Sequence, residues 1–192
     1  MASLVAEAQH VQALLNGEGV CIAALNSKRQ TVISGPTDSV SKILERAGEQ
    51  GLEAARLPVS LAFHSQLVAA AAPALAAHLA NEQFEPLRRK VISTITGNEL
   101  SATSNLPELL YQQITSPVRF LEAGTQANSA GIDLWLEVGP GHVLGGIMGD
   151  ITETPCISLD AGGDSLRGLL NACGAAYVLG QAVNHKTLFA DR

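Results

Sequence analysis

The first 58 residues alternate between short apolar runs and stretches in which apolar residues recur every three or four positions. The short runs predict strands, and the helical spacing predicts helices between them. The expected strands are 1–5, 20–25, 30–34 and 52–59, and the expected helices are 6–15 and one that follows Asp38 and ends at Gly48 or Gly51. This order is typical of the ferredoxin-like fold, so we expect a small subdomain with a four-stranded antiparallel sheet over 1–58.

The pattern after residue 64 consists of longer helical segments that alternate with apolar strands. The alanine-rich stretch 65–81 predicts a long helix, because alanine has the highest helix propensity, with a break or kink at Pro73. Further helices are expected at 106–114, 118–130 and 165–179, strands at 91–96 and 132–138, and an extended stretch at 152–161. Alternation of this kind indicates a layered α/β (α+β) structure.

Composition and charge exclude several classes of protein. Hydrophobic residues make up 46% of the 192 positions and charged residues 16%, which predicts a packed core and not a disordered chain. The net charge is -6 and no basic patch occurs, so we expect no nucleic-acid partner.

The sequence also predicts neither a membrane segment nor a metal site. Its apolar runs are shorter than the roughly 18 residues that a membrane span needs. A cytoplasmic location is expected because the cysteines are interpreted as reduced thiols. Cys21, Cys156 and Cys173 lie far apart and read as reduced thiols, while the five histidines show no zinc-type spacing. We therefore expect no metal and no bound cofactor.

One histidine, His64, stands where a strand-like run meets the alanine-rich helix. Such a junction is a usual place to present a reactive side chain into a cleft. An imidazole can take a proton from a hydroxyl group at neutral pH and return it to a leaving group, and a serine nucleophile needs such a partner. The alternative is a histidine that only caps the following helix, and the local pattern by itself favours that alternative.

Three segments around and after this histidine resemble the malonyl-type acyltransferase domain of polyketide and fatty acid synthases. They are Leu-Pro-Val-Ser-Leu-Ala-Phe-His-Ser at 57–65, Ser-Pro-Val-Arg-Phe at 116–120 and Leu-Glu-Val-Gly-Pro-Gly at 136–141. The nucleophile of that family lies in a Gly-His-Ser-x-Gly motif, which this sequence does not contain. The resemblance therefore implies the C-terminal part of an acyltransferase, beginning after its serine.

The resemblance also implies a division of the chain into three parts. They are the ferredoxin-like subdomain at 1–58, the C-terminal part of an α/β-hydrolase-like core at 59–152 and a post-acyltransferase linker at 153–192.

The resemblance implies a function for five residues. In the family, the histidine that matches His64 is the base of a Ser-His dyad, and its second ring nitrogen bonds to a main-chain carbonyl that aligns with Gln113. Residues 61–64 correlate with the extender unit: His-Ala-Phe-His is the malonyl pattern and Tyr-Ala-Ser-His the methylmalonyl pattern. This chain reads Leu61-Ala62-Phe63-His64, so it departs from the malonyl pattern at Leu61. Beside the base, the Phe63 ring leaves little room for an α-methyl branch. The alternative is that Phe63 is simply a core residue.

Two further residues attract attention but are interpreted as structural. Arg119 could clamp a carboxylate, but in the family that arginine follows the nucleophile, so a structural role is favoured. Glu137 could be mistaken for the acid of a catalytic triad, and we expect it to anchor local backbone instead.

The implied activity is transfer of a malonyl-type unit from CoA to the phosphopantetheine thiol of an acyl carrier protein. The implied partners are the carrier protein, the CoA thioester, the missing N-terminal part of the acyltransferase and a neighbouring ketosynthase. By itself the chain is expected to be inactive. The alternative hypothesis is a catalytically inert ferredoxin-like scaffold that binds a carrier protein or another polypeptide.

Overall fold

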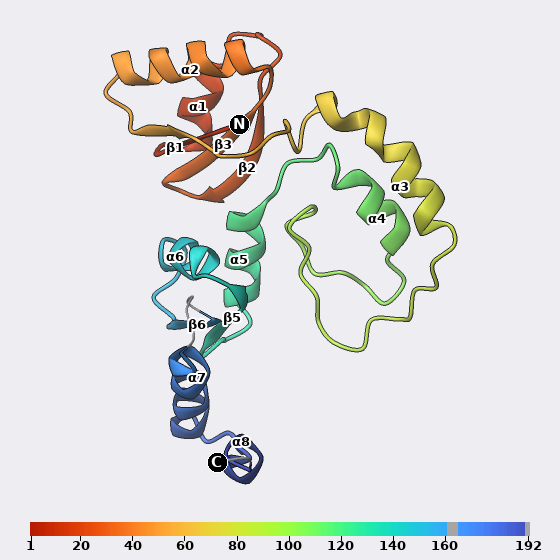
Figure 1. Ribbon diagram of the computed structural model, residues 1–192, viewed down its shortest axis with the longest axis vertical. Helices are drawn as coiled ribbons and strands as arrows, with labels where there is room; N and C mark the ends of the chain where they lie inside the picture. The colour runs from red at the N-terminus through yellow and green to blue at the C-terminus, as the bar shows by residue number, and fades with distance from the viewer. Residues whose placement is uncertain (161–164, 191–192) are drawn as a thin grey trace. The chain divides into compact units, whose positions relative to one another are not determined.

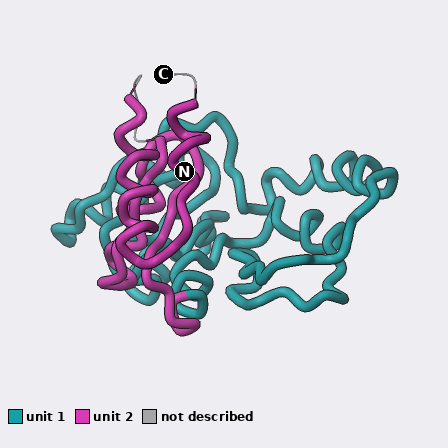
Figure 2. Tube along the Cα trace, turned by 90° about the horizontal axis from the view of Figure 1, so that it is seen from below, with its two compact units in different colours: residues 1–127 teal, residues 128–192 magenta. Residues whose placement is uncertain are grey.

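The structure is a computed structural model that describes residues 1–160 and 165–190. The chain divides into two compact units, Met1–Ala127 and Asn128–Arg192, which Figure 2 shows in teal and magenta.

The first unit begins with a ferredoxin-like subdomain, as the sequence predicted. Its elements are β1 (Ala2–Leu4), α1 (Ala8–Leu14), β2 (Cys21–Ser27), β3 (Gln30–Ser34), α2 (Thr37–Glu49) and β4 (Ala54–Arg56). The four strands form one antiparallel sheet in the order β2-β3-β1-β4. Figure 1 shows the sheet with both helices above it.

The two faces of this sheet bury different sets of side chains, because successive residues of a strand point to opposite sides. In β3, Ile33 packs with apolar residues of α1 and α2 in the larger core. Its neighbour Val32 packs on the other face in a smaller cluster with Ala23 and Val118. Through Val118, the second face holds a segment that is distant in sequence.

The alanine-rich stretch forms two consecutive helices and not one. A 3₁₀ helix, η1 (Gln66–Ala71), is followed by α3 (Ala72–Leu79), with Pro73 in the first turn of α3. The predicted break therefore falls just before the proline, since a residue without an N–H fits the first turn of a helix and not its interior.

The expected strand at 91–96 is wrong. The segment turns back on itself, so that the Ser93 N–H donates to the carbonyl of Asn98 and the Leu100 N–H donates to that of Val91, each across 2.8–2.9 Å. Gly97, with a φ of +74°, makes this reversal possible. Residues 91–93 thus pair with the returning chain at 98–100 and not with a larger sheet. The helices α4 (Leu106–Gln112) and α5 (Phe120–Asn128) follow, close to the predicted positions.

The second unit contains a short parallel sheet with connecting helices. Its elements are β5 (Trp135–Pro140), α6 (Val143–Gly149), β6 (Cys156–Asp160), α7 (Arg167–Val178) and α8 (His185–Leu188). β5 and β6 pair in parallel, with Trp135 opposite Cys156. β6 lies in the segment 153–192 that was expected to be a linker, and it pairs with β5. Residue 161, the end of the expected extended stretch, lies outside the described residues.

Over the described part of the chain, no helix is long and apolar enough to cross a membrane.

The core of the ferredoxin-like subdomain provides a stability test. Ile33 has no exposed surface, so Ile33→Ala should lower the free energy of unfolding by about 2–5 kcal/mol through lost burial and the cavity left behind. Urea unfolding followed by circular dichroism measures this loss. Val5, which is 41% exposed, is the control, and Val5→Ala should change the value by no more than about 0.5 kcal/mol. Equal losses in the two variants would contradict the assigned core.

Candidate active site

His64 lies between the end of the ferredoxin-like sheet and the start of η1. Ser65 directly follows it and caps η1, accepting a hydrogen bond from the Leu67 N–H. His64 itself has a φ of +57°, in the left-handed region that non-glycine residues rarely adopt. The chain therefore makes a sharp local reversal at the histidine, and this reversal sets the direction of its side chain.

The imidazole of His64 contacts two main-chain carbonyls through one nitrogen. Nδ1 lies 3.1 Å from the carbonyl oxygen of Gln113 and 2.9 Å from that of Ser116. Both partners are acceptors, so the neutral ring must carry its proton on Nδ1 and donate it to them. Nε2 then keeps a lone pair and can accept a proton from another group. This is the state that a general base needs.

The two carbonyls come from the end of α4 and the turn that follows it. Gln113 directly follows the last residue of α4, and the final carbonyls of a helix lack partners within the helix. The Thr115 and Ser116 N–H groups both donate back to Gln112, which tightens the turn and brings the Ser116 carbonyl beside that of Gln113. The side chain of Gln113 takes no part in the contact.

Strand β2 contacts both the segment that follows the two carbonyls and the backbone of His64. The Val118 N–H donates to the carbonyl of Ala23 and the Leu25 N–H donates to that of Val118, each at 2.8 Å, so the segment after Ser116 forms a bridge beside β2. At the start of the same strand, the Cys21 thiol lies 3.6 Å from the carbonyl of His64. Burial raises the pKa of this thiol, which keeps it protonated and able to donate.

The three residues before His64 lie in different surroundings. Phe63 is 45% exposed next to the histidine, and Leu61 is 56% exposed. Leu61 and Ala62 line a cavity of about 290 Å³ together with residues of the ferredoxin-like subdomain such as Arg56, whereas Phe63 and His64 are not part of its lining. Phe63 thus directly precedes His64 and lies outside the cavity that Leu61 and Ala62 line.

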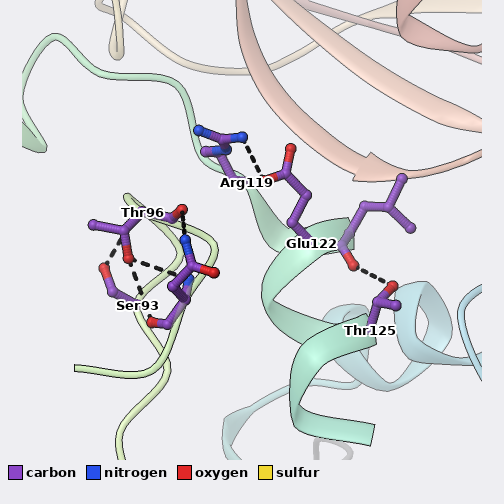
Figure 3. Close-up of polar contacts among 7 residues, drawn as sticks. Ser93, Thr96, Arg119, Glu122 and Thr125 are labelled. Carbon is purple, nitrogen blue, oxygen red and sulfur yellow. Dashed lines mark hydrogen bonds and ion pairs between the residues drawn. The ribbon is translucent and has the colours of Figure 1, made fainter. Parts of the chain in front are cut away.

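Arg119 is engaged in an ion pair at the start of α5. Its guanidinium forms an ion pair with a carboxylate oxygen of Glu122 across 2.5 Å, and Figure 3 marks this pair with a dashed line. The main-chain N–H of Arg119 donates to the carbonyl of Thr94. A Cβ on Gly97 would come within 2.6 Å of the same Glu122 carboxylate, so the turn that contains Ser93 and Thr96 packs closely against this pair. These contacts support the structural role of Arg119.

Glu137 holds the N-terminus of α6 in the second unit. Its carboxylate accepts hydrogen bonds from the Leu144 and Gly145 N–H groups at 2.9 Å and from the Ser158 hydroxyl at 2.7 Å. The expected anchoring of local backbone is confirmed. Burial raises the pKa of Glu137, but the hydrogen bonds from Ser158, Gly145 and Leu144 together outweigh it and hold the pKa below its ordinary value.

Within residues 1–160 and 165–190, no group of three or more His, Cys, Asp or Glu side chains is placed to hold a metal ion. The chemistry that the arrangement at His64 offers is acid-base chemistry, because two carbonyls orient its imidazole.

Comparison with known proteins assigns the family. Residues 1–152 match the family model described as "Acyl transferase domain". The chain belongs to the acyl transferase domain family.

Relatives of this acyltransferase chain are both free-standing enzymes and parts of large synthases. It is 35% identical over 133 residues to the malonyl CoA-acyl carrier protein transacylase of Bacillus subtilis, covering 69% of this chain and 42% of that enzyme. It is 31% identical over 202 residues to the conidial yellow pigment biosynthesis polyketide synthase of Emericella nidulans, covering 100% of this chain and 9% of that protein.

A solved structure with the same fold is the acyltransferase domain of the iterative polyketide synthase in enediyne biosynthesis. The TM-score is 0.90 and the identity 34%, covering 100% of this chain and 50% of that one. The chain thus spans about half of the acyltransferase domains it matches.

Sequence reasoning missed two features of the candidate site. The carbonyl of Ser116 was not anticipated, because a backbone oxygen has no signature in the sequence. The left-handed backbone of His64 was also missed. Its one sequence signal is a serine directly after the histidine, since serine hydroxyls commonly close turns by bonding to nearby backbone.

Glu137 gives this acyltransferase chain a pH-dependent contribution to stability. A carboxylate whose pKa is lowered by folding stabilises the protein above its unfolded pKa, about 4.3, and this contribution disappears as the pH falls through the folded value. Glu137→Gln should therefore lower the melting temperature of the second unit at pH 7, and the difference from the parent should shrink below about pH 4. The single tryptophan, Trp135 in β5, reports this transition by fluorescence.

Glu153 in the same unit is exposed and provides the matched control. Glu153→Gln should leave the melting temperature unchanged at both pH values. A Glu137→Gln difference that stayed constant down to acidic pH would show that the charge of this carboxylate does not stabilise α6.

Proposed function

We propose that this chain supplies the general base and the extender-unit contact of an acyltransferase that moves a malonyl group from CoA to the phosphopantetheine thiol of an acyl carrier protein. His64 is the base, the carbonyls of Gln113 and Ser116 orient it, and a serine in a Gly-His-Ser-x-Gly segment is the nucleophile. The observation that carries the proposal is the engagement of His64 Nδ1 by two acceptors, which leaves Nε2 free.

In the first step, Nε2 of His64 takes the proton of the serine hydroxyl while the serine oxygen attacks the thioester carbon of malonyl-CoA. The carbon–sulfur bond breaks, and the imidazolium returns the proton to the CoA sulfur. The product is a malonyl-serine ester. During this step the ring is positively charged, and the carbonyl dipoles of Gln113 and Ser116 stabilise it in the way that a carboxylate does in a Ser-His-Asp triad.

In the second step, Nε2 takes the proton of the carrier protein's phosphopantetheine thiol. The sulfur attacks the ester carbon, the carbon–oxygen bond breaks, and the proton passes to the serine oxygen. The same orientation of the ring therefore serves both directions. The partners proposed for this chain are a CoA thioester, an acyl carrier protein, the part of the domain that carries the serine, and a neighbouring ketosynthase, in the cytoplasm.

Phe63 is proposed to set the preference for the extender unit. Its phenyl ring is partly exposed directly beside the base, where an α-substituent of the acyl group would have to fit. A methylmalonyl group carries a methyl branch there, and one methyl group changes binding by about 1–3 kcal/mol. Leu61 and Ala62 line the separate cavity. They are therefore proposed to affect the extender-unit preference indirectly, by setting the backbone path that leads to Phe63 and His64.

Removal of the base tests the proposal. In an acyltransferase that contains this chain together with its Gly-His-Ser-x-Gly segment, His64→Ala should lower malonyl transfer to the carrier protein by about 10²–10⁴-fold, the usual contribution of a positioned acid-base group. Both loading of the serine from malonyl-CoA and transfer to the thiol should be impaired in rapid-quench experiments.

Gln113→Ala is the matched control, because the contact uses its carbonyl, which the substitution keeps. It should change the transfer rate far less than His64→Ala. The 192-residue chain alone should gain no malonyl adduct in intact-mass measurements. Near-normal transfer by His64→Ala, or an adduct on a serine of the isolated chain, would contradict the proposed function.

Replacement of the phenyl ring tests the origin of specificity. Phe63→Ser should lower the ratio of kcat/KM for malonyl-CoA over methylmalonyl-CoA by about 10–200-fold at most, because space opens for the methyl group. Competition between the two thioesters, read by mass spectrometry, measures the ratio. Phe84 is similarly exposed, at 38%, and Phe84→Ser should leave the ratio unchanged. If the ratio does not respond to Phe63→Ser, the ring does not contact the acyl branch.

A further inference from the structure

A buried serine, Ser65, makes hydrogen bonds to the backbone before and after the histidine. Ser65 is only 3% exposed, although it lies in a segment whose neighbouring side chains are largely exposed. Its hydroxyl donates to the carbonyl of Ala62 at 2.6 Å and accepts from the Leu67 N–H at 3.3 Å. One side chain thus joins the backbone on both sides of His64.

His64, which lies between the two backbone groups that Ser65 binds, has an unfavourable backbone conformation. A side chain with a Cβ atom in the left-handed region is strained, and such residues persist only where the surrounding structure fixes them. At His64 the fixing groups are the Ser65 hydroxyl and the Cys21 thiol on the backbone, and the two carbonyls on the ring. The Ser65 hydroxyl is the only one of these that bonds on both sides of the strained residue.

We propose that Ser65 is a positioning residue for the base: its hydroxyl keeps the backbone of His64 left-handed, and thereby keeps Nδ1 directed at the carbonyls of Gln113 and Ser116. If the backbone at His64 relaxes to a negative φ, its Cα–Cβ bond swings away and the ring loses both acceptors. The inference rests on the proposed function only in taking His64 as the base.

The proposal predicts a loss of rate without a loss of substrate binding. In the complete acyltransferase, Ser65→Ala removes the hydroxyl and leaves the Ala62 carbonyl and the Leu67 N–H without this partner. A displaced base should lower kcat by about 10- to 100-fold. KM for malonyl-CoA should stay unchanged, since Ser65 is buried and no substrate contact is removed. Ser65→Thr keeps the hydroxyl and should restore most of kcat.

A spectroscopic readout separates positioning from general stability. A free neutral imidazole carries its proton mainly on Nε2, whereas the two carbonyls of this site hold it on Nδ1. The ¹⁵N chemical shifts of His64 in mildly alkaline buffer distinguish the two tautomers. Ser65→Ala should move the proton partly from Nδ1 to Nε2, and Ser65→Thr should move it back.

Ser93 is the matched control, because it is also buried, at 9% exposure, and its hydroxyl also closes a turn by accepting from the Ile95 and Thr96 N–H groups. Ser93→Ala should lower the melting temperature comparably but change neither kcat nor the tautomer. Parent-like kcat and ¹⁵N shifts in Ser65→Ala, or an equal loss of kcat in Ser93→Ala, would overturn the proposal. A shift of the tautomer without a loss of kcat would establish the positioning and instead refute His64 as the base.

Discussion

The contact between one ring nitrogen of His64 and two backbone carbonyls is the interaction on which the site depends. An imidazole can be a base only through a nitrogen that carries no proton, and a free ring does not fix which nitrogen that is. Here Nδ1 faces the carbonyls of Gln113 and Ser116, at 3.1 and 2.9 Å, so the other nitrogen is the acceptor. The orienting group is backbone, which no side-chain substitution can remove directly.

The ferredoxin-like subdomain contributes to this contact although it supplies none of its atoms. Strand β2 meets the backbone of His64 through Cys21 and the carbonyl-bearing segment through Val118. His64 and Gln113, which are 49 positions apart in the sequence, are thus brought together by a common strand. A buried core that includes Ile33 packs against the sheet, and Ile22 of the same strand packs against this core.

Sequence reasoning predicted the elements whose hydrophobic periodicity is strong. It failed where a turn or a helix cap determines the local structure. The strand and helix order of residues 1–58 followed from spacing alone, because each element buries one face against the same core. The segment 91–96 has the composition of a strand, but Gly97 reverses the chain. Helix α6 was not anticipated. It contains three glycines, which are poor helix formers, and its first N–H groups are satisfied by Glu137 from another element.

The features of the candidate site also fall into those that the sequence predicted and those that only the structure shows. His64 and the alignment with Gln113 came from a resemblance in three segments, and the structure brings these two residues into contact. The carbonyl of Ser116, the left-handed backbone of His64 and the Ser65 hydroxyl contact came from the structure alone. These are properties of backbone geometry, which depends on the three-dimensional path of the chain and not on the identity of one residue.

The most direct test of the account is to locate the protons on His64. A neutron diffraction structure of the acyltransferase, from deuterated crystals in mildly alkaline buffer, shows deuterium on ring nitrogens. The account predicts deuterium on Nδ1, between the carbonyl oxygens of Gln113 and Ser116, and none on Nε2. Deuterium on Nε2 with a bare Nδ1 would contradict it, since Nε2 would then have no lone pair to accept the proton of a serine.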